Sequence, residues 1–160
     1  MSSPLSASDC INENDVIGVT LSNEGITGQK QYVSILRETN SRVIYDFQPQ
    51  GVTRVYLRYS EEIIGYEEYF NAEKIGVEHE PSPTNVPGGW SEVSNFVPAS
   101  TLESLKKMSS GTHQCLATNT YEGMVNGETI KAVMIENLNL PVLFEQRTPA
   151  GGNSWTIEAL

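Results

Sequence analysis

Apolar and polar residues alternate along much of this chain in short runs, and turn-forming residues separate the runs. Between Thr112 and Leu160, four runs rich in apolar and β-branched residues are divided from one another by Asn, Gly or Pro. Asn126-Gly127 suits the positive φ angles of a two-residue hairpin turn. The pattern therefore predicts an antiparallel meander with strands at 114–121, 128–136, 140–145 and 153–160.

The first half of the chain carries the same alternation. Its clearest example, 53–59, is typical of a half-buried strand. One face of this run consists of Thr53, Val55, Leu57 and Tyr59, and the other of Arg54, Tyr56 and Arg58. A hairpin with 42–47 is predicted, because Gln48-Pro49-Gln50-Gly51 between the two runs favours a turn. Further strands are predicted at 15–21, 26–38 and 72–80.

Three segments interrupt this series of strands. The run 61–70 fits either a short helix or a strand bulged around Gly65. The segment 81–89 is rich in Pro and Gly, which predicts a loop without regular structure, either a connector or a functional loop. One helix is predicted at 101–109, where Ser100 and Glu103 have the spacing of a capping box. Its apolar stripe consists of Leu102, Leu105 and Met108, and so short a helix must pack on the sheet.

Length and charge narrow the class of protein. A chain of 160 residues fits one domain, which we expect to span 15–160 after a flexible segment at 1–14. The 20 acidic residues outnumber the 10 basic ones and give a net charge of −10, so we expect no nucleic-acid partner. No apolar run approaches the ~20 residues that cross a bilayer, so no transmembrane segment is predicted.

The residues that could carry chemistry do not form a recognisable catalytic or metal-binding motif. In Glu78-His79-Glu80 the histidine would point away from both carboxylates on a strand, so the three cannot chelate one ion. Paired carboxylates such as Glu61-Glu62 are best explained as a solvated face. No phosphate-binding loop or nucleophile elbow occurs. We therefore expect no catalytic residue, no metal and no cofactor, which argues against an enzyme.

The chain has two cysteines, Cys10 and Cys115, whose spacing fits no zinc or redox motif. If the protein is exported, we expect them to form a disulfide that closes a loop of ~100 residues. The alternative is two unrelated buried thiols.

The end of the chain resembles a known family. A short helix followed by four antiparallel strands, with the sequence Leu-Asn-Leu-Pro-Val at 138–142, is similar to the C-terminal part of periplasmic LolA-like and LppX-like proteins. These proteins include the outer-membrane lipoprotein carriers, and the similarity covers about 112–160. It implies a mainly β (α+β) fold: a strongly curved antiparallel sheet, or half-barrel, with one or two short helices on its concave face. Acyl chains or another apolar ligand would lie between the helices and the sheet.

The resemblance also implies a periplasmic or secreted protein. Residues 1–10 lack the basic start and apolar stretch of a signal peptide. We therefore expect that a signal has already been removed, with a cytoplasmic protein as the alternative.

These arguments favour a non-catalytic exported protein that binds a lipid or another apolar ligand, since the strands carry more large apolar residues than one helix can cover. The residues predicted to line its cavity are Val55, Leu57, Tyr59, Leu105, Met108, Ile130, Ala132, Met134, Val142, Phe144, Trp155 and Ile157. The alternative for the same residues is a fully packed core without a cavity.

A second hypothesis is a protein–protein interaction module, such as an inhibitor, a chaperone or an immunity-like protein, that uses an acidic, aromatic surface. The predicted contact residues are Tyr66, Glu67, Glu68, Tyr69 and Trp90, because aromatic residues dominate binding hot spots. A lined cavity would favour the first hypothesis, and a filled core with an exposed patch would favour the second.

Overall fold

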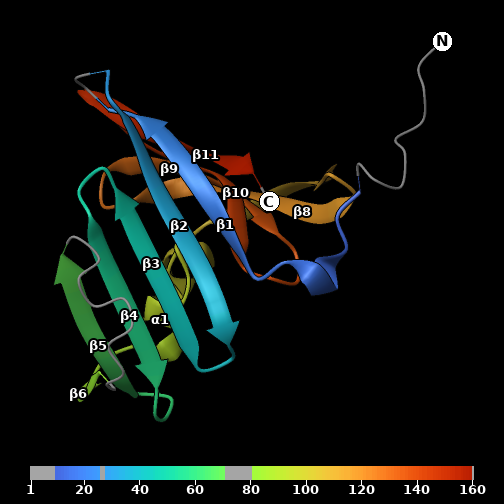
Figure 1. Cartoon of the computed structure of the whole chain (residues 1–160). Coiled ribbons are helices and arrows are strands. Elements are labelled where there is room, and N and C mark those ends of the chain that lie inside the picture. The colour runs from blue at the N-terminus through green and yellow to red at the C-terminus, as the bar shows by residue number, and fades with distance from the viewer. Residues whose placement is uncertain (1–9, 26–27, 71–80, 160) are drawn as a thin grey trace.

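The described part of the chain forms one antiparallel sheet of 11 strands (Figure 1). The computed structural model describes residues 10–25, 28–70 and 81–159. The strands of the first half are β1 (Gly18–Glu24), β2 (Lys30–Thr39), β3 (Arg42–Gln48), β4 (Val52–Arg58), β5 (Ile63–Phe70) and β6 (Ser82–Asn85). Those of the second half are β7 (Lys106–His113), β8 (Leu116–Val125), β9 (Glu128–Ile135), β10 (Leu140–Thr148) and β11 (Gly151–Ala159).

The first and last strands meet at the centre of the sheet, where the order is β6-β5-β4-β3-β2-β1-β11-β10-β9-β8-β7. Every other neighbour in the sheet is also a neighbour in the sequence. At the central junction, the carboxylate of Glu158 accepts a hydrogen bond from the Ser22 hydroxyl (2.7 Å) and one from the Lys30 ammonium (3.0 Å). Each half is therefore a meander: the first runs outward from this junction to β6, and the second runs back to it from β7.

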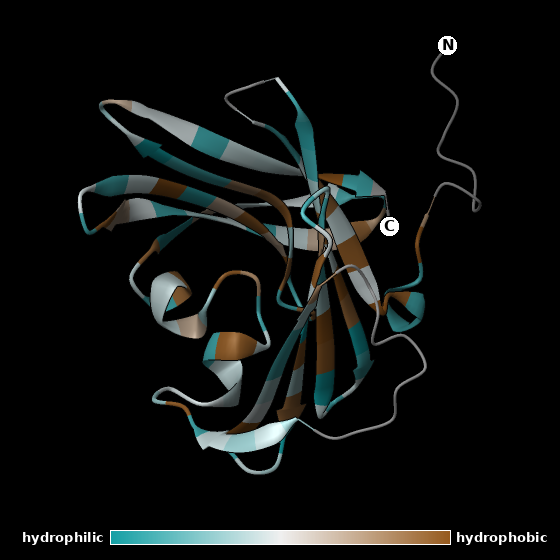
Figure 2. Ribbon diagram, turned by 60° about the vertical axis from the view of Figure 1, so that its left-hand side comes forward, coloured by the Kyte–Doolittle hydropathy of each residue, from teal (hydrophilic) through white to brown (hydrophobic). Residues whose placement is uncertain are grey.

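Two short helices, α1 (Trp90–Val93) and α2 (Ala99–Glu103), connect the two edges of the sheet. They lie on one face, in the angle between the two halves of the sheet (Figure 2). The prediction of a mainly β chain built on an antiparallel sheet is confirmed. The edge strands β6 and β7 do not pair with each other, and the sheet is neither closed nor strongly curled as the half-barrel expectation required. Among the described residues, no helix has the length and apolar character to cross a membrane.

The predicted helix at 101–109 is wrong beyond Glu103. The residues Lys106–His113 form β7, which pairs along its length with β8 and leaves Met108 on an exposed edge. Ser, Thr and Gly in this stretch are poor helix formers, and the backbone partners offered by β8 decide its structure. The predicted capping box is not formed either, because Glu92 of α1 accepts hydrogen bonds from the Ser100 amide and hydroxyl, both at 2.9 Å.

Three further segments have an ambiguous or Pro-rich sequence: 61–70, 72–80 and 81–89. The run 61–70, left open between helix and strand, is strand β5. The prediction of a loop at 81–89 is wrong for Ser82–Asn85, which form strand β6. Among the described strands β6 pairs only with β5, and this edge position tolerates Pro83. The predicted strand at 72–80 lies outside the described residues.

The hairpin turn between β8 and β9 is confirmed. Asn126 has φ 52° and Gly127 has φ 82°, so both residues are left-handed, as a two-residue turn of this type requires. An added Cβ at Gly127 would meet nothing within 4 Å, so a substitution there causes backbone strain rather than a clash.

We expect Gly127→Val to lower the free energy of unfolding by about 1–2 kcal/mol, since a β-branched residue disfavours positive φ. Chemical denaturation of the variant against wild type measures this. Gly127→Asn is the matched control, because Asn tolerates the left-handed region better and should lose clearly less. Equal stability of the Val variant and wild type would contradict the turn geometry.

Most of the buried hydrophobic residues belong to two clusters. The first joins β1–β3 to the ends of β8–β10 and consists of Val19, Leu21, Val33, Ile35, Val43, Tyr45, Leu116, Ile135, Leu140 and Val142. The second lies between the helices and β9–β10 and consists of Val97, Leu105, Ile130, Ala132, Met134 and Phe144. Phe96 and Trp155 pack against both clusters and connect them.

Candidate binding site beside helix α1

The segment that carries α1 is held on the sheet at both of its ends. Gly89, at φ 67°, lies so close to the turn before β5 that an added Cβ would be 2.0 Å from the Glu61 carbonyl oxygen. The next residue, Trp90, donates its amide to that oxygen at 2.9 Å. After α1, Val97 is fully buried, and Phe96 packs edge-on against Phe144 with ring centroids 5.6 Å apart. Glycine at one end and two apolar residues at the other therefore fix α1 over the sheet.

Two pockets, both partly open to solvent, lie on either side of this segment and share Asn95. The Arg37 pocket has a volume of about 540 Å³. It is lined by Val16, Ile17, Arg37, Glu38, Thr39, Asn40, Val43, Trp90, Ser91, Ser94, Asn95, Asn137, Leu138 and Asn139. The aromatic groove has a volume of about 340 Å³. It is lined by Tyr45, Phe47, Arg54, Tyr56, Glu92, Val93, Asn95, Phe96 and Pro98.

Aromatic rings on β3 and β4 form one wall of the aromatic groove. The Tyr45 ring stacks on Phe47 at 6.4 Å and meets Tyr56 edge-on at 5.7 Å. The Tyr45 hydroxyl donates to the Val93 carbonyl at 3.1 Å, which ties the sheet to α1. Burial raises the pKa of Tyr45, and also that of Tyr56, so both hydroxyls stay neutral at physiological pH. The wall is thus a set of rings that hold one another in place.

A charged pair borders this wall at its outer end. The Arg54 guanidinium lies 4.9 Å from the Phe47 ring centre and forms an ion pair of 2.8 Å with Glu68. Burial and a hydrogen bond to the Glu68 carboxylate raise the pKa of Tyr66 to about 12, and its ring packs against Tyr56 in a tilted arrangement with centroids 5.1 Å apart. The groove therefore carries no unpaired charge at this end within the described residues.

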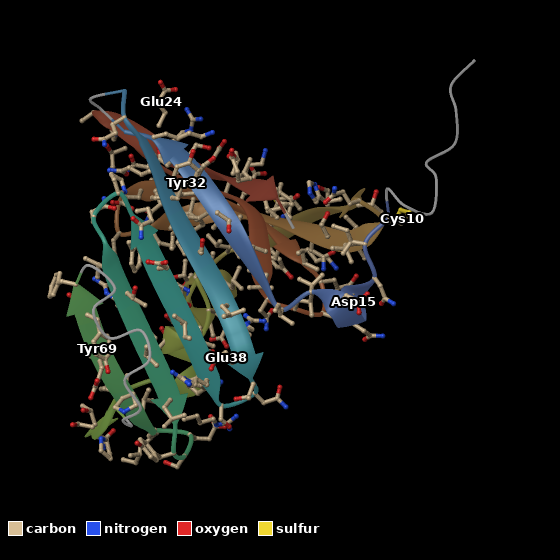
Figure 3. All side chains as sticks on the ribbon, in the orientation of Figure 1. Cys10, Asp15, Glu24, Tyr32, Glu38 and Tyr69 are labelled. Atoms are coloured by element: carbon tan, nitrogen blue, oxygen red, sulfur yellow. A yellow bond between two sulfur atoms is a disulfide. The ribbon has the colours of Figure 1, made fainter. Side chains whose placement is uncertain are left out.

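The Arg37 pocket has a different chemistry. The guanidinium of Arg37 donates to the Leu138 carbonyl, to the Asn139 carbonyl at 3.2 Å and to the Asn95 side-chain oxygen at 2.8 Å. Burial lowers the pKa of Arg37 from its ordinary value. Glu38, near the end of β2 (Figure 3), also lines the pocket, but it pairs with Arg42 at 3.0 Å. The groups that accept hydrogen bonds from Arg37 are therefore all neutral.

The structure brings together most of the predicted lining residues, but packs them against one another. Leu105, Ile130, Ala132, Met134 and Phe144 belong to the second buried cluster, with Trp155 beside it. Val142 and Ile157 belong to or pack on the first cluster. This arrangement corresponds to the packed core that was the alternative for these residues.

The remaining predicted lining residues lie elsewhere. Val55 and Leu57 lie on the opposite face of the sheet, because Arg54 and Tyr56 of the same strand face α1. Tyr59 follows β4, and its hydroxyl donates to the Pro81 carbonyl at 2.8 Å. Met108 is 53% exposed on the edge strand β7. These four residues cannot line one site with the second buried cluster.

Sequence reasoning missed the residues that do line the pockets. The alternation in β4 predicts two faces, and the predicted cavity lining uses the face with Val55 and Leu57 instead of the face with Arg54 and Tyr56. No pattern in the sequence indicated that Arg37 and Asn95 would meet. The predicted contact residues are also divided: Tyr66 and Glu68 share a face of β5, Glu67 and Tyr69 take the other, and Trp90 packs against the first cluster.

The disulfide between Cys10 and Cys115 is formed, with 5.1 Å between the two Cα atoms, so the alternative of two free thiols is wrong (Figure 3). The amide of Ile11 also donates to the Gln114 carbonyl at 3.0 Å, and a 3₁₀ helix follows at Glu13–Asp15. Residues 10–14, predicted as part of a flexible segment, are therefore tied to the turn between β7 and β8. The next residues, Val16 and Ile17, line the Arg37 pocket.

Neither a family model nor a curated protein sequence matches this chain. Among the described residues, no group of three or more His, Cys, Asp or Glu side chains is placed to hold a metal ion. The function has to be inferred from the two pockets themselves.

Proposed function

We propose that this chain is a non-catalytic binding protein that holds an apolar small molecule, such as a lipid acyl chain, in the aromatic groove. The observation that carries this proposal is a groove of about 340 Å³ between β3–β4 and α1, lined mainly by aromatic and aliphatic side chains. Its volume falls at the lower end of the range typical of small-molecule sites, and its few polar groups would orient a ligand.

The physical basis of binding is the burial of apolar surface. The rings of Tyr45, Phe47 and Tyr56 are already ordered by their mutual contacts, so a ligand loses little free energy in fixing them. Each methylene group of an acyl chain that leaves water contributes about 0.8 kcal/mol. A ligand of this kind is also what the resemblance to the lipoprotein carriers implies.

We propose in addition that the protein acts in the periplasm or outside the cell. The disulfide between Cys10 and Cys115 supports this, because such bonds persist in oxidising compartments and are rare in the cytosol. A cytoplasmic protein, the alternative, would keep these two thiols reduced.

A second candidate function is protein–protein interaction, and one observation favours it. Tyr66 and Phe70 are 40% and 60% exposed on the same face of β5, with Glu68 between them. Exposed aromatic rings beside a carboxylate are suited to contact a polypeptide. This strip continues the wall of the aromatic groove toward the sheet edge through the contact of Tyr66 with Tyr56.

A fluorescent fatty-acid probe tests the first candidate. We expect saturable uptake by wild type, and Phe47→Asp should weaken it at least tenfold, because a carboxylate would stand in the wall of the groove. Leu57→Asp is the matched control: it places the same charge on the adjacent strand β4 but on the opposite face, and should leave uptake unchanged.

Native mass spectrometry of protein purified from cells provides a readout without any variant, since a retained lipid appears as added mass. Equal loss of uptake in both variants at equal melting temperature would contradict the groove as the site. A wild-type protein that neither takes up the probe nor carries added mass would favour the interaction candidate.

A further inference from the structure

The guanidinium of Arg37 is half-buried without a compensating negative charge. Arg37 lies on the helix-bearing face of β2, opposite Val43 of β3. Its three hydrogen bonds go to two backbone carbonyls and to the amide oxygen of Asn95, which are all neutral acceptors. In the part of the chain that the structure describes, no carboxylate forms an ion pair with it. A guanidinium has five N–H donors, so these bonds leave two of them, including the Nε–H, for another acceptor.

Even partial burial of this charge has a cost in free energy. Desolvation lowers the pKa of Arg37, but a guanidinium remains protonated in proteins, so the charge cannot be relieved by loss of the proton. Buried charges are normally paired, because water no longer solvates them. An anion that enters the pocket would meet a cation that is already partly desolvated and held in place by three acceptors.

We propose that the Arg37 pocket binds a small molecule through its carboxylate group, which pairs with the charge of the Arg37 guanidinium. Nη2 already donates twice, to Asn95 and Asn139, so the carboxylate accepts a charge-assisted hydrogen bond from Nε–H or from the second Nη1–H. The pocket has a volume of about 540 Å³, enough for an organic acid with a sizeable body. Its wall offers Ser91 and Ser94 as hydrogen-bonding groups and the half-buried indole of Trp90 as an apolar surface.

The charges around the pocket favour a single negative charge over a phosphate dianion. Glu38 lines the pocket, although Arg42 pairs with it at 3.0 Å. Glu13 accepts a hydrogen bond from the side chain of Asn137, another lining residue, at 3.4 Å. With a net charge of −10 on the chain, two negative charges on a ligand would meet more repulsion than one.

This site is separate from the aromatic groove, because α1 and the segment that follows it stand between the two, with Asn95 as the shared wall. Carboxylate binding at Arg37 therefore does not depend on acyl-chain binding in the groove. The failure of either proposal would leave the other standing.

Benzoate and benzamide form a matched pair of probes, since they share shape and size and differ in charge. Titration of the full chain is followed by NMR at the Arg37 Nε–H and the Trp90 indole N–H. We expect benzoate to shift both signals in a saturable way, and benzamide to bind at least tenfold more weakly. Inorganic phosphate should bind no more tightly than benzoate.

Variants then assign the effect to Arg37. Arg37→Gln should weaken benzoate binding at least tenfold, and Arg37→Lys should retain part of it, because the charge remains while the guanidinium donors are lost. Arg147→Gln removes an exposed cation outside the pocket and should leave binding unchanged. Equal binding of benzoate and benzamide to wild type, or no saturable shift with benzoate, would overturn the proposal even if Arg37→Gln fails to fold. A folded Arg37→Gln variant with unchanged affinity, or tighter binding of phosphate, would also overturn it.

Discussion

A variant with Cys10→Ser and Cys115→Ser should be less stable than wild type by about 4–5 kcal/mol on the chain-entropy model. The two cysteines are 105 positions apart, so the bond restricts most of the unfolded chain. For a domain of this size the melting temperature should fall by about 10–20 °C. Thermal unfolding followed by circular dichroism at 220 nm measures the change.

Reduction of wild type with dithiothreitol is the matched treatment and should produce the same loss without any substitution. An unchanged melting temperature in both cases would show that the link between the N-terminal segment and the turn at Gln114 adds nothing to stability. If the variant loses stability but reduced wild type does not, then the serine substitutions rather than the missing bond are responsible.

Phe144→Ala should destabilise the protein by about 3–5 kcal/mol, the usual cost of removing a large aromatic side chain from a packed core. Phe144 is 7% exposed and packs with Leu105, Ile130 and Met134 in the second buried cluster. It also anchors Phe96, on which the position of α1 depends. Urea unfolding of the variant measures the loss.

Phe70→Ala is the control for this substitution, because it removes the same side chain from a site that is 60% exposed and should change stability by less than about 0.5 kcal/mol. A Phe144→Ala variant with full stability but no uptake of a fatty-acid probe would place Phe144 in a ligand cavity, as the sequence pattern predicts.

Local signals in the sequence predicted the C-terminal strands well. The Asn126-Gly127 turn and the runs around it suffice for β8–β11, because a two-residue turn fixes which strands pair. The predicted helix at 101–109 is wrong beyond Glu103 because the structure there depends on a strand outside the segment. The spacing of Leu102, Leu105 and Met108 fits a helix, but the pairing of β7 with β8 depends on residues outside that window.

The candidate site was largely beyond sequence reasoning. Alternation in β4 separates Val55 and Leu57 from Arg54 and Tyr56, but it does not reveal which face the helices cover. The Arg37 pocket is assembled from the end of β2, the segment after α1 and the turn between β9 and β10. Those three segments have no common motif. Only the cysteine pair could be proposed in advance, because the chain has just two cysteines.

The pairing of the first strand with the last has a consequence for synthesis and folding. While the ribosome is still adding residues 151–159, β1 has only one of its two neighbours, and its other edge is unpaired in the middle of the future sheet. The meander β1–β5 can form early from local hairpins, but the two halves join only once β11 is available to pair with β1. A nascent chain of this protein therefore exposes an interior strand edge until β11 emerges, and that edge is where a chaperone or a second nascent chain would attach.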